Sequence, residues 1–283
     1  MAVTAADVKE LRESTGAGMM DCKKALEENG GDFDAAKDYL RQKGLASLDK
    51  RSARTAGEGL VEAFVAEDGR SAALVQVACE TDFVAKGEQF GALATDVARA
   101  VFDAATHEIS GALEERITEL VEGAAINLGE KIQVDKAHFV KTESGVLDVY
   151  LHRTGGWAKK GVVVEMDGDV AADKLRELAH EVALHIQFAR PSVLEADQVD
   201  PAELEDERRV AEAKAREEGK PEDIVPRIAE GAVKKYVKQA ALLEQPYVKD
   251  DKKSVRQWLD SESGGKARVV GFARFEIGEE SGA

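Results

Sequence analysis

Residues 79–86 bring together several groups that could take part in chemistry. Cys79 offers a thiol, Glu80 and Asp82 offer carboxylates, and Thr81 offers a hydroxyl. A catalytic thiol needs a lowered pKa and a base within reach. The sequence places no base beside Cys79, and the two nearby carboxylates would raise the pKa of its thiol. A thiol enzyme is therefore a hypothesis that these residue types argue against.

Phe83 is the aromatic residue of the same stretch, and it directly follows Asp82. Burying an unpaired carboxylate is costly, so a Phe beside an ionised Asp is difficult to place in its own core. We therefore predict that Phe83 projects outward and suits a pocket of another molecule. The alternative is that Phe83 is a core residue and that Asp82 only caps the next helix.

The stretch 79–86 is predicted to be a loop between a strand and a helix. Residues 72–78 are apolar except for Gln76, and we interpret them as the second strand of a hairpin with 60–66. After the loop, apolar residues recur at helical spacing from Phe90 to Phe102. The predicted order is hairpin, loop and helix.

The same order recurs later in the chain. Strands at 146–152 and 162–166 are followed by a loop at 167–169 and by a helix whose apolar residues span 175–186. We interpret this as a degenerate internal duplication. The second copy has no counterpart of the Asp-Phe pair, so that pair is not needed merely to join a strand to a helix.

Three short helices are predicted at the N-terminus, at about 5–16, 19–28 and 32–44. Thr4 and Asp7 resemble a capping box at the start of the first. Three helices in so short a segment form a compact bundle that resembles the ubiquitin-associated domain. Acidic and basic residues balance in number over the bundle and its linker, so this part of the chain is free to approach an acidic partner.

Met19 and Met20 are adjacent at the start of the second helix. Neighbouring residues on a helix lie about 100° apart, so we expect one methionine in the core and the other exposed on a partner surface. Residues 45–57, which follow the bundle, are predicted to form a basic linker or a short helix.

The rest of the chain is predicted to complete the two copies and to add an arm. A helix at 113–128 and a strand at 132–140 follow the first copy, and a strand at 269–277 should join the second sheet. All five prolines lie after residue 190, where helices at 202–217 and 224–237 form a hairpin with little apolar surface. Such a hairpin projects from the body, either as a solvated stalk or as a contact arm.

These elements predict an α+β fold. It combines a ubiquitin-associated-like bundle of three helices, a duplicated core of antiparallel sheets with helices, and a protruding helical hairpin. The expected domains are the bundle and linker at 1–56, the first core subdomain at 57–142, the second at 143–190 with 241–263, the arm at 191–240, and a C-terminal module at 264–283.

The composition of the chain indicates which partners and which cell compartment to expect. The chain has 283 residues and a formal charge of −16, and a negative field repels nucleic acid phosphates, so we expect no direct nucleic acid partner. No apolar run reaches the ~20 residues that span a bilayer, and the first ten residues do not resemble a signal peptide. The two cysteines are far apart, which fits a reducing compartment. We therefore expect a cytoplasmic protein without membrane contact.

Sequence motifs that bind cofactors or metals are either missing from this chain or wrongly spaced. The sequence has no Gly-x-x-x-x-Gly-Lys-Ser/Thr motif that would cradle a nucleotide. His180, Glu181 and His185 approach a zinc motif, but the second His is one residue late, which turns the two rings about 140° apart on a helix. We expect neither a metal site nor a cofactor.

Four separated stretches, residues 10–26, 81–86, 128–130 and 271–276, carry a resemblance that covers essentially the whole chain. The second of them reads Thr-Asp-Phe-Val-Ala-Lys. The chain resembles the elongation factor Ts family, the guanine-nucleotide exchange factors of bacterial elongation factor Tu. It is similar to the longer form of the family, since both the arm and the terminal strand are present.

The resemblance implies a site and a partner. The partner would be elongation factor Tu, in its GDP-bound and nucleotide-free forms, and the side chain of Phe83 would act as a wedge that dislodges Mg²⁺ so that GDP leaves. The residues implied for this contact are Thr81, Asp82, Phe83 and Val84. The residues implied for docking are Arg12, Met19, Met20, Lys23, Gly129 and His152. The arm is a candidate surface for a homodimer.

A rival hypothesis of another class is a binding or assembly protein. A ubiquitin-associated-like bundle with a helical arm could be a scaffold that has no exchange activity. An exchange factor acts in catalytic amounts and a scaffold only stoichiometrically, so the amount of protein required discriminates between them.

Overall fold

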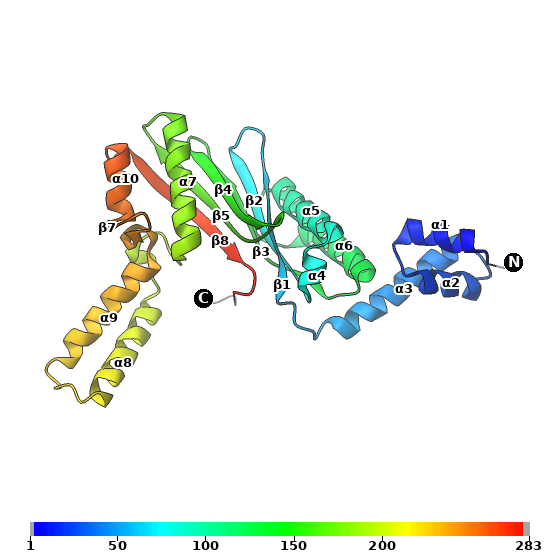
Figure 1. The fold of residues 1–283 in the computed structure, drawn as a ribbon, viewed down its shortest axis with the longest axis horizontal. Coiled ribbons are helices and arrows are strands. Elements are labelled where there is room, and N and C mark those ends of the chain that lie inside the picture. Colours follow the sequence, from blue (N-terminus) through cyan, green and yellow to red (C-terminus); the bar gives the residue numbers. More distant parts are fainter. Residues whose placement is uncertain (1–2, 280–283) are drawn as a thin grey trace.

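The structure, a computed structural model, describes residues 3–279, except for the side chains of 45–47, 49 and 50. The outer ends of the expected segments 1–56 and 264–283 therefore lie outside the described residues. The molecule is elongated, with a helical bundle at one end, two sheets in the middle and a helical arm near the other end (Figure 1). Helices and antiparallel sheets together confirm the predicted α+β class.

The N-terminal bundle consists of α1 (Ala5–Thr15), α2 (Met19–Glu28) and α3 (Phe33–Arg51). As predicted, a capping box starts α1: Thr4 Oγ1 accepts the Asp7 N–H at 3.3 Å, and the Thr4 N–H donates to the Asp7 carboxylate at 2.8 Å. The small core that the three helices enclose consists of Val8, Leu11, Cys22, Ala25, Leu26, Ala36 and Leu40.

The third helix is longer than predicted. The prediction that it ends near Gly44 was wrong, because α3 continues to Arg51. Of the predicted linker 45–57, only residues 52–57 lie outside helix and strand. Gly44 is buried against α6, where an added Cβ would lie 2.7 Å from Ile126 Cδ1. This glycine thus allows close helix packing and does not end the helix.

The first sheet contains β1 (Glu58–Val65), β2 (Ser71–Cys79) and β3 (Ile132–Lys141), in the order β1-β2-β3. The predicted hairpin is confirmed, with Glu58 opposite Cys79 and Val65 opposite Ala72. Helices α5 (Glu88–Ala104) and α6 (Gly111–Leu128) pack on one face of this sheet and bury Phe90 completely.

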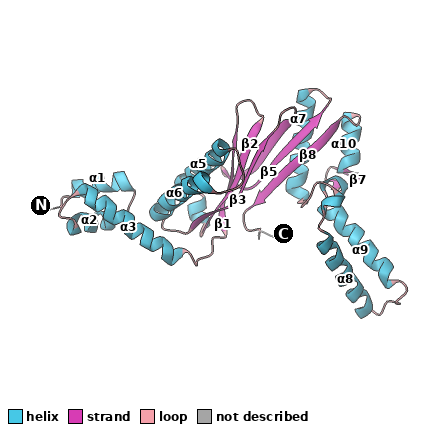
Figure 2. Ribbon diagram, turned by 180° about the vertical axis from the view of Figure 1, so that it is seen from behind, coloured by secondary structure: helices cyan, strands magenta, loops and turns pink. Residues whose placement is uncertain are grey.

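The second sheet repeats this plan with β4 (Val146–Thr154), β5 (Trp157–Gly168) and β8 (Ala267–Glu276), covered by α7 (Ala172–Ala189). The C-terminal strand pairs antiparallel with β5, as the alternation of its residues predicted. Helices therefore cover the outer faces of two sheets that lie next to each other (Figure 2).

The two sheets pack together through a cluster that includes Val61, Leu74, Val163 and Phe275. They approach closely at Gly161, where an added Cβ would lie 2.6 Å from Val61 Cγ1. The sheets and helices thus form one layered body, which supports the short helix described below.

The arm consists of α8 (Pro201–Glu217) and α9 (Val225–Ala240), and the Tyr236 hydroxyl donates to Glu203 across it at 2.8 Å. It extends away from the sheets (Figure 1). The remaining short elements are the 3-10 turns Ala196–Gln198 and Leu242–Glu244, the strands β6 (Pro246–Tyr247) and β7 (Asp250–Ser254), and the helix α10 (Val255–Ser263).

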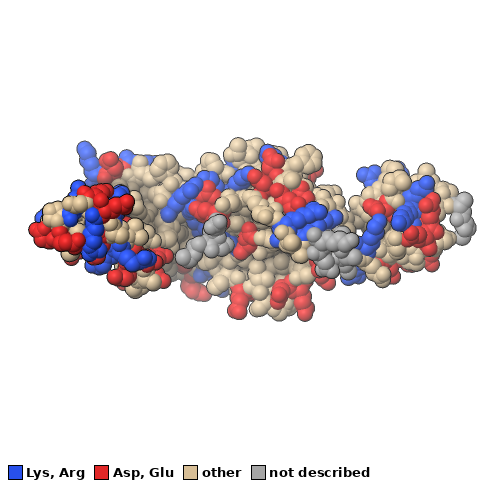
Figure 3. Space-filling view, turned by 90° about the horizontal axis from the view of Figure 1, so that it is seen from below, with Lys and Arg blue, Asp and Glu red and all other residues tan. Residues whose placement is uncertain are grey.

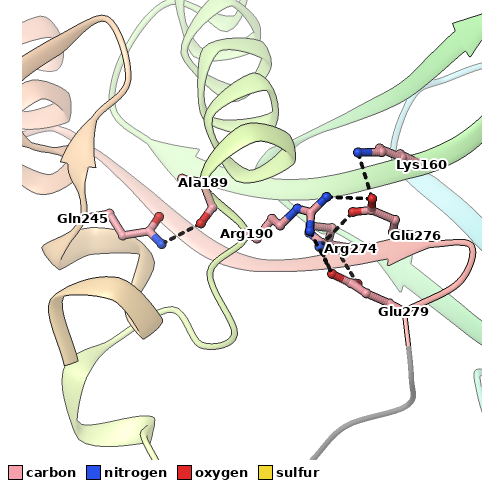
Figure 4. A network of polar contacts seen from close by, with 7 residues as sticks. All are labelled: Lys160, Ala189, Arg190, Gln245, Arg274, Glu276 and Glu279. Atoms are coloured by element: carbon pink, nitrogen blue, oxygen red, sulfur yellow. Dashed lines mark hydrogen bonds and ion pairs between the residues drawn. The ribbon is translucent and has the colours of Figure 1, made fainter. Parts of the chain in front are cut away.

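A network of ion pairs holds the end of β8 against the end of α7 (Figure 4). Glu276 is contacted by Arg274 at 3.1 Å, and by Lys160 and Arg190 at 2.8 Å each. Arg274 also bonds Glu279, and its side chain is only 7% exposed. Next to this network, Gln245 at the root of the arm donates to the Ala189 carbonyl at 3.2 Å.

Candidate partner-binding site

Phe83 stands out from the body of the molecule. Its side chain is 86% exposed, whereas the next two residues, Val84 and Ala85, are 8% and 1% exposed. The buried pair fixes the backbone to the core of the first sheet, so the ring that precedes them points outward. The prediction that Phe83 projects outward is confirmed, and the alternative that it is a core residue is wrong.

The segment that carries Phe83 is a turn of helix. Residues Asp82–Ala85 form α4, so the prediction of a plain loop was wrong. Thr81 is the N-cap, and its hydroxyl accepts the Val84 N–H at 3.4 Å. The alternative in which Asp82 caps the next helix is also wrong, because Gly87 occupies the N-cap position of α5. Local capping and the burial of Val84 together hold this turn in place.

A charge lies directly beside the exposed ring. Asp82 pairs with Lys86 at 2.6 Å, and both side chains are more than half exposed. The hydrogen bond from Lys86 holds the pKa of Asp82 below its ordinary value, so the carboxylate is ionised at neutral pH. The site therefore presents an apolar ring beside a solvated ion pair.

The base of this turn is fastened to the connection between α6 and β3. The Glu130 carboxylate accepts the backbone N–H groups of Glu80 and Thr81 at 3.0 Å each, and it also accepts the Thr81 hydroxyl. Sequence reasoning named Gly129 but missed Glu130. The only signal was its place in the stretch 128–130, because no local pattern connects it to Thr81.

Cys79 is a poor nucleophile in this environment. It is fully buried, and burial followed by the nearby Glu130 charge raises the pKa of its thiol to about 12. The sequence had attributed the raised pKa to Glu80 and Asp82, but burial and Glu130 are the larger causes. A thiol enzyme based on this residue is therefore disfavoured by the structure as well.

The bundle presents the two methionines differently from the prediction. Both are exposed, Met19 by 58% and Met20 by 74%, so the expectation that one is in the core was wrong. The core is already closed by residues such as Leu11 and Leu26, which leaves no space for a methionine from the first turn of α2. With Lys23 they line a shallow groove between α1 and α2, whose other lining residues are Val3, Thr4, Ala5, Val8 and Lys9.

The remaining predicted residues lie in separate places. Arg12 is exposed on α1 of the bundle. Gly129 ends α6 with φ of 76°, one residue before Glu130, and is therefore next to the base of α4. His152 is exposed on β4, and its Nδ1 lies 2.9 Å from the Tyr150 hydroxyl. The structure thus brings Gly129 to the Phe83 turn and leaves the bundle and His152 as distinct surfaces.

The two histidines of α7 do not share a ligand. His185 is fully buried between Gln245, which accepts its Nε2–H at 2.8 Å, and the Val248 N–H, which donates to its Nδ1 at 3.3 Å. His180 lies on another side of the helix, 3.2 Å from Asp148. Within residues 3–279, no group of three or more His, Cys, Asp or Glu side chains is arranged to hold a metal ion.

The surface charge is mixed, and the helices are not of the kind that spans a membrane, within the described residues. On the face shown in Figure 3, basic and acidic side chains lie side by side over both the arm and the bundle. None of the helices in the described part of the chain combines the length and apolar composition required to cross a bilayer.

Comparison with known proteins identifies the family. The family model described as elongation factor TS matches residues 80–279. The elongation factor Ts of Nitratidesulfovibrio vulgaris is 46% identical, and the alignment covers 100% of this chain and 98% of that protein. The chain belongs to the elongation factor Ts family. The elongation factor Ts proteins of Desulfovibrio desulfuricans and Clostridium botulinum are 43% and 40% identical, over 99% and 98% of this chain and 99% and 93% of their own lengths.

The resemblance seen in the sequence is therefore confirmed. Three of its four stretches lie inside the part matched by the elongation factor Ts family model, and this part includes the α4 turn. The first stretch, in the bundle, lies before residue 80 but within the alignments to the full-length elongation factor Ts relatives.

Proposed function

We propose that this chain is a translation elongation factor that binds elongation factor Tu and promotes the release of GDP and its exchange for GTP. The observation that carries the proposal is the 86% exposure of Phe83 on a turn whose following residues are buried. An exposed aromatic ring on a fixed support gains free energy when it enters an apolar pocket of a partner. Membership of the elongation factor Ts family names that partner.

The proposed mechanism is the displacement of a metal site in the partner. Phe83 and Asp82 enter the nucleotide-binding domain near its magnesium ion. Mg²⁺ demands near-ideal octahedral geometry at about 2.0–2.1 Å, so a small shift of the helix that positions its ligands weakens the binding of both the ion and the phosphates. The chain makes and breaks no covalent bond in this scheme, so it acts as an exchange factor on a partner GTPase and in the cytoplasm, where translation takes place.

Docking surfaces away from the wedge supply the free energy for its insertion. We assign this role to the exposed bundle residues Met19, Met20, Lys23 and Arg12, and to the second sheet around His152. Linkage requires that any factor by which this chain weakens GDP binding is also the factor by which GDP weakens the binding of this chain. The partner would therefore bind more tightly in its nucleotide-free form.

The test is stopped-flow release of a fluorescent GDP from elongation factor Tu at saturating concentrations of this chain. Phe83→Ala is expected to slow stimulated release by about tenfold or more while leaving most of the docking affinity, because the ring acts in the transition to the open site. The matched control is Phe188→Ala, which removes an aromatic ring that is 78% exposed on α7. Equal release rates for wild type and Phe83→Ala would contradict the mechanism.

The scaffold alternative is tested in the same assay. An exchange factor present at a small fraction of the partner concentration accelerates release from the whole partner population, whereas a scaffold affects only the fraction that it binds. Release that stops at the stoichiometric fraction would favour the scaffold.

A further inference from the structure

We propose that Glu130 is a positioning residue for Phe83, through its hydrogen bonds to the residues that begin α4. This inference rests on the proposed function, since it assigns the group that holds the wedge. Glu130 itself lies outside α4, in the connection from α6 to β3, and its carboxylate contacts the backbone and side chain of residues 49 and 50 positions earlier.

The Glu130 carboxylate satisfies donors that the strand leaves unpaired. Strand β2 ends at Cys79, opposite Ile132 of β3, so the next two N–H groups, of Glu80 and Thr81, have passed the end of the ladder. Both donate to Glu130 Oε2 at 3.0 Å. Hydrogen bonds from backbone N–H groups to a carboxylate are stronger than those to a neutral acceptor. They fix the direction in which the chain leaves the sheet.

The second carboxylate oxygen orients the N-cap. A threonine hydroxyl has one hydrogen to donate and two lone pairs that accept. Thr81 donates its hydrogen to Glu130 Oε1 at 2.5 Å, so a lone pair is left to accept the Val84 N–H at 3.4 Å. Glu130 therefore determines the rotation of the group that caps α4, and α4 is the turn that carries Phe83.

A reciprocal contact ties the two segments together. The Glu80 carboxylate accepts the Lys131 N–H at 2.7 Å and an Arg54 N–H at 3.2 Å. These two donors lower the pKa of Glu80, so it remains ionised at neutral pH. Each segment thus places a carboxylate on the backbone of the other, and neither can shift without loss of bonds on both sides.

The same junction contacts the N-terminal bundle. Lys131 Nζ donates to the Arg54 carbonyl at 3.0 Å, and Arg51 at the end of α3 donates to the Ala125 carbonyl of α6 at 2.9 Å. The segment that leaves the bundle and the turn that carries the wedge are therefore fastened to the same helix–strand connection. Glu130 therefore lies in the connection to which both segments are fastened.

The experiment compares Glu130→Ala and Glu130→Gln with wild type in the full chain. The alanine variant loses all three hydrogen bonds, and the glutamine variant keeps the shape and one acceptor oxygen. At saturating concentration we expect stimulated GDP release to be about tenfold slower for Glu130→Ala and about threefold slower for Glu130→Gln. The concentration of factor that gives half-maximal stimulation should change by less than about twofold. The control is Glu115→Ala, which removes an exposed acidic side chain from α6.

A second measurement tests positioning without the partner. Amide hydrogen exchange followed by mass spectrometry should show faster exchange over residues 80–86 in Glu130→Ala, a smaller increase in Glu130→Gln, and no change over residues 162–168 of the second sheet.

The outcomes separate the two claims. Wild-type exchange over 80–86 in Glu130→Ala would overturn the positioning role, even if this chain releases GDP as proposed. A loss of release that is explained entirely by weaker binding would also overturn it, because Glu130 would then be a docking residue. Failure of the wild-type chain to release GDP would remove the proposed function and would leave the exchange result to decide whether Glu130 holds the turn.

Discussion

The two copies of the hairpin-and-helix unit differ most where the hairpin leads into its helix. In the second copy only residues 169–171 separate β5 from α7, whereas residues 80–87 separate β2 from α5 and include α4. Both connections join equivalent elements, since each links the second strand of a hairpin to the helix that covers its sheet. A short connection is therefore sufficient for the fold, and the additional residues of the first copy are available for function.

The two connections also use different acceptors at equivalent places. In the second copy, the Asp169 N–H donates to the Lys266 carbonyl, just before β8 begins. In the first copy, the N–H groups of Glu80 and Thr81 donate to the Glu130 side chain, just before β3 begins. The acceptor is thus a backbone carbonyl in the second copy and a side-chain carboxylate in the first copy. The carboxylate has two oxygens, so it can hold both the chain and the Thr81 hydroxyl.

The largest expected effect sharpens the comparison inside the first copy. Phe90 is fully buried on α5 and Phe83 is exposed on α4. Phe90→Ala should lower the free energy of unfolding by about 3–5 kcal/mol, because it leaves a cavity in the core. Phe83→Ala should change it by less than about 0.5 kcal/mol, because no core contact is lost. Urea denaturation measures both, and a loss above about 1 kcal/mol for Phe83→Ala would show that the ring has a structural role.

A somewhat smaller loss of stability is expected when the ion pairs that hold β8 in the second sheet are broken. Glu276→Ala should lower the free energy of unfolding by about 2 kcal/mol, because Lys160 loses this carboxylate and the buried Arg274, together with Arg190, keeps only Glu279. The matched variant in the first sheet is Glu58→Ala, which breaks a partly exposed pair with Lys159 and should cost less than about 1 kcal/mol. Equal losses in thermal or urea unfolding would remove this distinction between the sheets.

The smallest expected effect concerns pH and compares one histidine in each unit, the partly buried His138 on β3 and the fully buried His185 on α7. Burial lowers the pKa of both below the ordinary value. An unfolded histidine titrates near about 6.5, so below that pH the unfolded chain takes up protons that the folded chain resists. Stability should therefore fall as the pH decreases through 6.5 toward the depressed folded pKa, by at most about 1.4 kcal/mol per pH unit for each histidine.

Urea unfolding at several pH values between about 7.5 and 5 measures this slope. His138→Gln and His185→Gln should each reduce the slope of the free energy of unfolding against pH. A variant that is less stable at every pH still gives a clear result, because only the slope is compared. Burial raises the pKa of Asp148, which contributes with the opposite sign, so Asp148→Asn should make the acid loss steeper. Slopes that are the same in wild type and His185→Gln would contradict the assignment.

Much of the fold followed from patterns within short stretches. The capping box at Thr4, the two hairpins, the covering helices and the addition of the last strand were predicted from residue types and spacing, and they agree with the structure. The outward direction of Phe83 was also predicted, because the charge beside it is a neighbour in sequence. Such features depend on residues within a few positions of each other, so the sequence determines them directly.

Other features were decided only when distant segments met. α3 continues past Gly44 because α6 packs there, and both methionines are exposed because other residues already fill the bundle core. The α4 turn is held by a carboxylate 49 positions away, which no local pattern announces. Burial and side-chain partners depend on which surfaces the folded chain brings together, and that is why only the tertiary structure shows how the ring of Phe83 is held.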